Sequence, residues 1–132
     1  MSDDPAILIC VGATKAGTSS LYRYLRNHPD VYARSIKEIH YFDTVDFDTY
    51  QYQLKTLSRR RADLERQLAA AEADLDVWKS LNIQRQIADV AAVVSMLERG
   101  EDGEEDYLVY LLEGLDERKV ACDITPAYAL LS

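Results

Sequence analysis

The sequence predicts an α/β fold in which helices flank a parallel sheet and a helical hairpin is inserted between strands. Residues 6–11 are an apolar run typical of a buried strand, and small residues at 12–17 lead from it into a helix at 18–27,. Residues 118–124 have the apolar character of a second buried strand. Between these strands, residues 50–99 contain no glycine or proline and repeat apolar side chains at helical spacing,. The order strand, helix, helices, strand favours parallel strands, because parallel pairing needs long crossover connections.

The strand, loop and helix at the start of the chain predict a P-loop-like anion site. The first N–H groups of a helix lack intrahelical partners, and the helix dipole adds positive potential at that end. Lys15 adds a full positive charge within the loop. A nucleoside triphosphate loop places its lysine directly after the second glycine, but here Thr18 follows Gly17 and the lysine lies three residues after Gly12,. The loop therefore predicts a site for a phosphate or a phosphosulfate.

The order of residues in this loop resembles the 5′-phosphosulfate loop of the sulfotransferases that use 3′-phosphoadenosine 5′-phosphosulfate (PAPS). The resemblance is closest to the bacterial and heparan-type members. The loop and the end of the following helix carry it through Gly12, Lys15, Gly17, Thr18, Ser19, His28 and Pro29. Residues 37–42 and 120–128 are similar to two later segments of the family, so the matches cover about half of the chain. The resemblance implies that residues 1–132 are the N-terminal part of a sulfotransferase domain, with a helical insertion at about 44–103.

Five residues are candidates for roles in sulfuryl transfer, and the resemblance implies that of Glu38. Lys15 would neutralise the leaving phosphate, and Glu38 would act as the general base that deprotonates a hydroxyl or amine acceptor,. His40 is the second candidate base, with a packing role as the alternative,. Asp123 and Thr125 would orient Lys15 or contact the acceptor, unless they only cap a turn,. The alternative for Glu38 is a surface carboxylate in an ion pair.

The resemblance implies PAPS as the co-substrate and requires no metal. The loop would bind the phosphosulfate through its backbone N–H groups and side chains, with the glycines allowing close approach. The binding residues are then Gly12, Thr14, Lys15, Ala16, Gly17, Thr18 and Ser19. In the family, the contacts to the 3′-phosphate and adenine follow the segment that 120–128 matches, so we expect them beyond Ser132. A sheet truncated in this way would leave an unpaired strand edge and uncovered apolar surface, and hence low stability.

The helical insertion leaves two structures open. Residues 50–99 form either two helices folded as a hairpin, with Ser80 or Asn82 capping the second, or one long helix with a break in phase,. The apolar stripe either packs against the parent domain or forms a homodimer. The stripe includes Leu75 and Trp78.

Composition limits the partners. The 132-residue chain carries a net charge of −8, which argues against a general nucleic-acid surface,. No apolar run is long enough to span a membrane, and Asp3 and Asp4 precede a run too short for a secretory signal, so we expect a cytoplasmic protein,. The acceptor would be a carbohydrate, a lipid or another small molecule. Two other functions stay open: a P-loop nucleotide kinase or NTPase, which needs magnesium-dependent ATP binding, and a non-catalytic helical interaction module built on residues 50–99.

Overall fold

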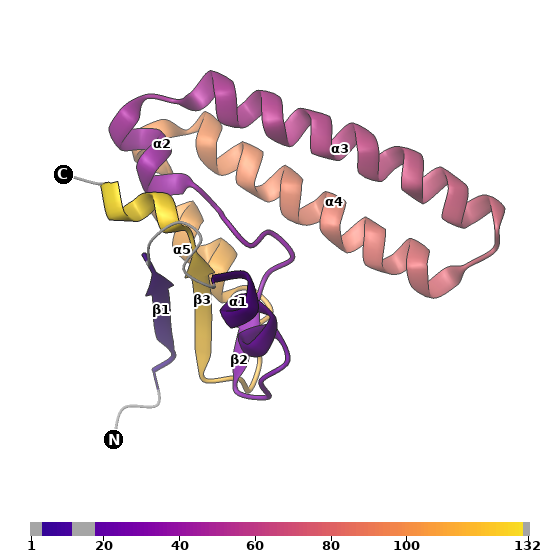
Figure 1. Ribbon diagram of the computed structural model, residues 1–132, viewed down its shortest axis with the longest axis horizontal. Helices are drawn as coiled ribbons and strands as arrows, with labels where there is room; N and C mark the ends of the chain where they lie inside the picture. The colour runs from indigo at the N-terminus through magenta and orange to yellow at the C-terminus, as the bar shows by residue number, and fades with distance from the viewer. Residues whose placement is uncertain (1–3, 12–17, 131–132) are drawn as a thin grey trace.

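The two largest features of the fold are a small parallel sheet and a long helical hairpin (Figure 1). The computed structural model describes residues 4–11 and 18–130, with side chains for 4–11 and 19–128. In chain order the elements are β1 (Ala6–Cys10), α1 (Thr18–Arg26), β2 (Val31–Ala33), α2 (Tyr41–Phe47), α3 (Tyr50–Ala73), α4 (Val77–Glu98), the 3₁₀ helix η1 (Gly100–Gly103), α5 (Glu104–Leu112), β3 (Val120–Ile124) and the 3₁₀ helix η2 (Pro126–Leu130).

The sheet has the strand order β1-β3-β2, and β3 pairs in parallel with both neighbours. Val120 is aligned with Ala6 on one side and with Val31 on the other. Successive side chains of a strand point to opposite faces, so β3 contributes side chains to two hydrophobic cores, one on each face of the sheet. Ala121 belongs to the core that the helices form, whereas Cys122 and Ile124 pack with residues of α1 and β2. The strand expected at 118–124 is therefore the buried centre of the sheet.

The first strand is at the edge of the sheet and is open to solvent. Ile7, Leu8 and Ile9 are 37%, 40% and 42% exposed, although they follow one another in the strand and so point to alternating faces,. The prediction that this strand is buried is therefore wrong. Its apolar sequence suits a central strand, but β1 has a single neighbour, β3. An apolar edge of this kind is an aggregation hazard.

The helices α3 and α4 lie side by side as a hairpin, which decides between the two structures left open for residues 50–99 (Figure 1). Leu57, Leu64 and Ala71 are buried at seven-residue intervals along α3. The N-cap of α4 is Asp76, whose Oδ1 accepts a hydrogen bond of 3.1 Å from the Lys79 N–H. Neither Ser80 nor Asn82 is the cap, because α4 begins one turn earlier than their positions require. Among residues 4–11 and 18–130, no helix is long and apolar enough to cross a bilayer.

The apolar stripe does not continue through the tip of the hairpin. Leu75 has a left-handed backbone, with φ of 57°, and this turn takes the chain away from the α3 axis. Leu75 and Trp78 are 86% and 85% exposed. The prediction that both side chains belong to the buried apolar stripe is thus wrong. Helical spacing places residues on one face only within a continuous helix, and here a turn interrupts it.

The predicted fold class, an α/β fold with a P-loop-like parallel sheet flanked by helices, is wrong; helices dominate the structure. The hairpin helices have 24 and 22 residues, whereas the three strands have 5, 3 and 5. The main core explains this difference, since its buried members come mostly from α3, α4 and α5. Within the described chain, Ala121 is the only strand residue among those buried members.

Candidate functional site

The start of α1 lies beside the segment that carries Glu38. Ser19 is exposed in the first turn of α1, and the Lys37 ammonium donates a hydrogen bond of 3.2 Å to its Oγ. The loop residues predicted to bind phosphosulfate, namely Gly12, Thr14, Lys15, Ala16 and Gly17, lie outside the described residues. Thr18 begins α1, and its side chain is also outside the description. Helix start, hydroxyl and ammonium together form a donor set that suits an anion.

A chain of polar contacts runs from Lys37 through Glu38 and His40 to Asp43. Glu38 Oε1 lies 3.6 Å from Lys37 Nζ, and its Oε2 lies 3.0 Å from His40 Nε2. On the other side of the imidazole, His40 Nδ1 lies 2.9 Å from Asp43 Oδ2. Asp43 is buried, whereas Glu38 is 38% exposed. The histidine is therefore held between an interior carboxylate and one that solvent can reach.

The backbone at His40 is held in an uncommon conformation. With φ of 57°, His40 is in the left-handed region, where non-glycine residues are rare,. The amides on both sides are fixed by side chains from the other end of the chain: Ile39 N–H donates to Thr125 Oγ1 at 3.0 Å, and Tyr41 N–H donates to the Tyr128 hydroxyl at 3.1 Å. Such backbone conformations persist where the surroundings fix them, and they are frequent at functional sites.

A buried carboxylate, that of Asp123, binds both of the side chains that hold these amides. Asp123 at the end of β3 is 1% exposed and accepts three hydrogen bonds. The donors are Thr125 Oγ1 at 2.6 Å, the Tyr107 hydroxyl at 2.7 Å and the Tyr128 hydroxyl at 2.8 Å. Asp123 and Thr125 thus act on the backbone of residues 39–41 and through it position Glu38 and His40. Whether they also orient Lys15 lies outside the described residues.

The electrostatics of this network follow from burial. Burial raises the pKa of Asp123, and the three hydroxyl donors partly oppose the shift,. Burial, followed by the charge of Asp123, raises the pKa of Tyr107 and of Tyr128. Both phenols therefore stay protonated and remain donors to the carboxylate at neutral pH.

The pKa of His40 is raised above its ordinary 6.5, chiefly because Asp43 hydrogen-bonds its ring; burial opposes the shift, and Glu38 adds to it. Both ring nitrogens are engaged, Nε2 with Glu38 and Nδ1 with Asp43, so neither is open to take a proton from an acceptor,. The geometry accordingly favours Glu38 as the base and His40 as the residue that positions its carboxylate. Within the described residues, no group of three or more His, Cys, Asp or Glu side chains is arranged to hold a metal ion.

Titration of His40 checks this assignment. We expect NMR of its ring protons to give a pKa above 6.5, falling more in Asp43→Asn than in Glu38→Gln, because the Asp43 contact is the larger cause. Since the folded pKa is above the unfolded one, the stabilisation is fully present below the unfolded pKa of about 6.5 and is lost as the pH rises through the folded pKa. A His40 pKa at or below 6.5, or an equal response to both variants, would contradict the assignment.

Four residues of this arrangement received no site role from the sequence. Lys37 links Ser19 to Glu38, Asp43 holds the far side of His40, and Tyr107 and Tyr128 bind Asp123. Asp43 lies in the first turn of α2, three residues after His40, which is the N-cap of that helix. Tyr107 gave no such signal, because its contact with Asp123 depends on how α5 packs on β3.

Comparison with models of protein families, with curated proteins and with solved structures gave no significant match.

Proposed function

We propose that the chain takes part in sulfuryl transfer from PAPS to a hydroxyl or amine acceptor. The observation that carries the proposal is the hydrogen bond between Lys37 and Ser19, which links the start of α1 to Glu38 across 18 residues of sequence. A sulfotransferase needs an anion site and a base side by side, and this contact supports such a pairing of the start of α1 with Glu38. The resemblance of the loop sequence to phosphosulfate loops supports the same activity.

In this proposal the start of α1 binds the phosphosulfate, and the positive charge of Lys15 neutralises the oxygen that bridges phosphorus and sulfur. Positive charge there stabilises the leaving phosphate more strongly as the sulfur–oxygen bond breaks. Glu38 accepts the proton of the acceptor while the acceptor oxygen or nitrogen bonds to sulfur. His40 and Asp43 hold the carboxylate of Glu38 in place, and 3′-phosphoadenosine 5′-phosphate leaves.

Titration calorimetry with PAPS tests the proposal. We expect Lys15→Ala to bind about ten- to a hundredfold more weakly than the wild type, the effect of losing one charge-assisted hydrogen bond. Glu38→Gln should bind with unchanged affinity, because the base acts on the acceptor. Lys55→Ala, on the exposed surface of α3, is the control of equal charge and should also bind normally. Binding that Lys15→Ala and Lys55→Ala reduce equally, or no binding at all, would refute the proposal.

A further inference from the structure

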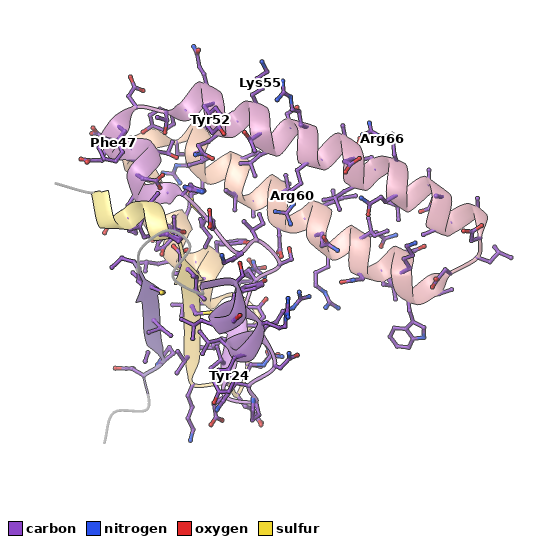
Figure 2. The ribbon with its side chains drawn as sticks, viewed as in Figure 1. Tyr24, Phe47, Tyr52, Lys55, Arg60 and Arg66 are labelled. Atoms are coloured by element: carbon purple, nitrogen blue, oxygen red, sulfur yellow. The ribbon has the colours of Figure 1, made fainter. Side chains whose placement is uncertain are left out.

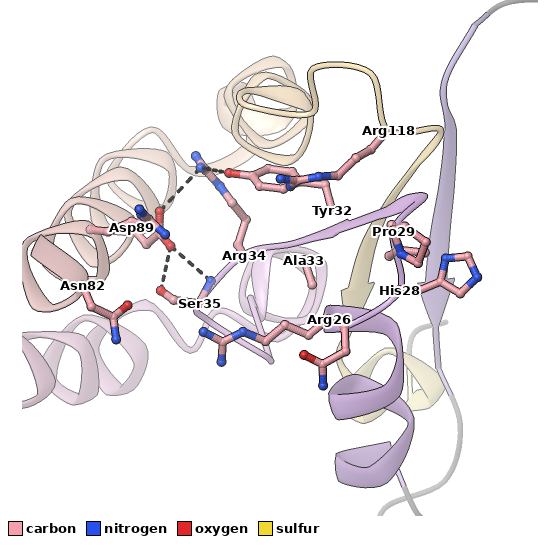
Figure 3. A pocket seen from close by; sticks show the side chains of 13 residues that line it. Arg26, His28, Pro29, Tyr32, Ala33, Arg34, Ser35, Asn82, Asp89 and Arg118 are labelled. Atoms are coloured by element: carbon pink, nitrogen blue, oxygen red, sulfur yellow. Dashed lines mark hydrogen bonds and ion pairs between the residues drawn. The ribbon is translucent and has the colours of Figure 1, made fainter. Parts of the chain in front are cut away.

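A pocket lined by arginines lies at the other end of α1. A pocket of about 610 Å³ is formed by the end of α1, the residues that lead into and out of β2, the middle of α4 and the residue at position 118 (Figure 3). Its volume falls within the usual range for small-molecule sites. Ser19 is in the first turn of α1 and Arg26 is its last residue, so the two places are about 10 Å apart along the helix axis,.

The pocket is strongly cationic although the chain is acidic. Four arginines line it, Arg26, Arg34, Arg85 and Arg118, against one carboxylate, Asp89. The net charge of the whole chain is −8. A concave cluster of one sign in a chain of the opposite sign concentrates counter-ions at that place.

The one carboxylate is already engaged by the pocket wall. Asp89 is 4% exposed, and its Oδ2 accepts hydrogen bonds from Ser35 N at 3.1 Å and Ser35 Oγ at 2.6 Å. Its Oδ1 lies 3.6 Å from Arg34 Nη1 (Figure 3). Arg34 also contacts Tyr32 and the exposed Glu113 at 3.8 Å. Asp89 and Arg34 therefore offset one another and form a fixed wall.

The remaining three arginines are exposed and come from separate parts of the chain. Arg26 extends from α1 toward Ser35 and Asn82, and Arg118 lies over the Tyr32 ring at 4.9 Å from its centroid (Figure 3). This contact with the ring holds the guanidinium group in place and leaves N–H groups for a ligand,. Arg85 enters from α4. Planar guanidinium groups bind phosphate and sulfate oxygens in pairs, which suits a tetrahedral oxyanion.

We propose that this pocket binds the phosphate or sulfate ester group of a small molecule through Arg26, Arg85 and Arg118. The site is separate from the place proposed for PAPS. Asn82 and Ser35 provide polar groups beside the arginines for the hydroxyls of a sugar or similar carrier. A phosphate ester carries more negative charge than a sulfate ester at neutral pH, so the two esters are distinguishable by affinity.

Titration calorimetry with glucose 6-phosphate, glucose 6-sulfate and inorganic phosphate tests the site. We expect saturable binding of at least one ester, weakened at least about tenfold in the double variant Arg26→Ala/Arg85→Ala. Both side chains are exposed, so the variant should fold normally. The control Lys55→Ala/Arg66→Ala removes the same charge from the outer side of α3 (Figure 2) and should bind as the wild type does.

The outcomes separate this site from the proposed PAPS site. Preference for the 6-phosphate or for the 6-sulfate supports the pocket and identifies the ester. Normal ester binding by Lys15→Ala supports it as well, whatever that variant does to PAPS binding. Equal weakening by the α3 control, weakening by Lys15→Ala alone, or no saturable binding of either ester would overturn the proposal.

Discussion

Replacing Asp123 by alanine is expected to lower the free energy of unfolding by about 3–5 kcal/mol. The change leaves three buried hydroxyl donors, on Tyr107, Thr125 and Tyr128, without their acceptor. Each hydrogen bond to a charged group contributes about 1.5–3 kcal/mol, and relief of the carboxylate's own desolvation offsets part of the loss. Urea unfolding followed by circular dichroism gives the value.

The same variant should also disturb His40, since Asp123 anchors the residues that hold the amides on both sides of it. We expect the pKa of His40 to fall in Asp123→Ala, because the ring is no longer kept between Glu38 and Asp43. Asp63→Ala removes an exposed carboxylate paired with Arg66 and should cost less than about 1 kcal/mol,. A loss of stability in Asp123→Ala no larger than in this control would show that the network does not hold the site.

Replacing Leu97 by alanine is expected to cost about 3 kcal/mol, as is usual for a fully buried leucine. Leu97 is 1% exposed and belongs to the core shared by the hairpin, α5 and the segment between β2 and α2. The loss of side-chain contacts and the remaining cavity both destabilise the folded state. The midpoint of urea unfolding should fall without a change in its slope.

The matched variant is Ile9→Ala on β1, where the side chain is 42% exposed. We expect it to lower the free energy of unfolding by less than about 1 kcal/mol, because folding buries little of the apolar area of this side chain. This order of effects follows from a fold held together by its helices. A larger loss in Ile9→Ala than in Leu97→Ala would mean that the sheet holds the fold together.

Local signals in the sequence predicted the elements near the candidate site well. The strand at 6–11 and the helix at 18–27 correspond to β1 and α1, because an apolar run, small residues and a following proline act over short distances,. Periodicity and the absence of helix-breaking residues also predicted that residues 50–99 are helical, but they left open a hairpin or one long helix. The turn at Leu75 was not predicted, since its left-handed backbone has no glycine to mark it.

The fold class and the supports of the site could not be predicted in this way. The apolar residues Ile7, Leu8 and Ile9 have the composition of a buried strand. The strand order of the folded sheet is what shows that β1 is at an edge. Glu38 and His40 were candidates from the sequence, but their fixation by Thr125 and Tyr128 spans more than 80 residues. Contacts of this length depend on packing, which neither periodicity nor spacing encodes.

The most direct test of sulfuryl-donor binding is a titration with PAPS followed through the backbone amide resonances. We predict that the amides of Thr18, Ser19 and Ser20 at the start of α1 shift in a saturable way, together with that of Glu38, which Lys37 links to Ser19. Magnesium ATP at the same concentration should move these resonances less. Unmoved resonances, or larger shifts with magnesium ATP, would contradict the account and favour a nucleoside triphosphate site.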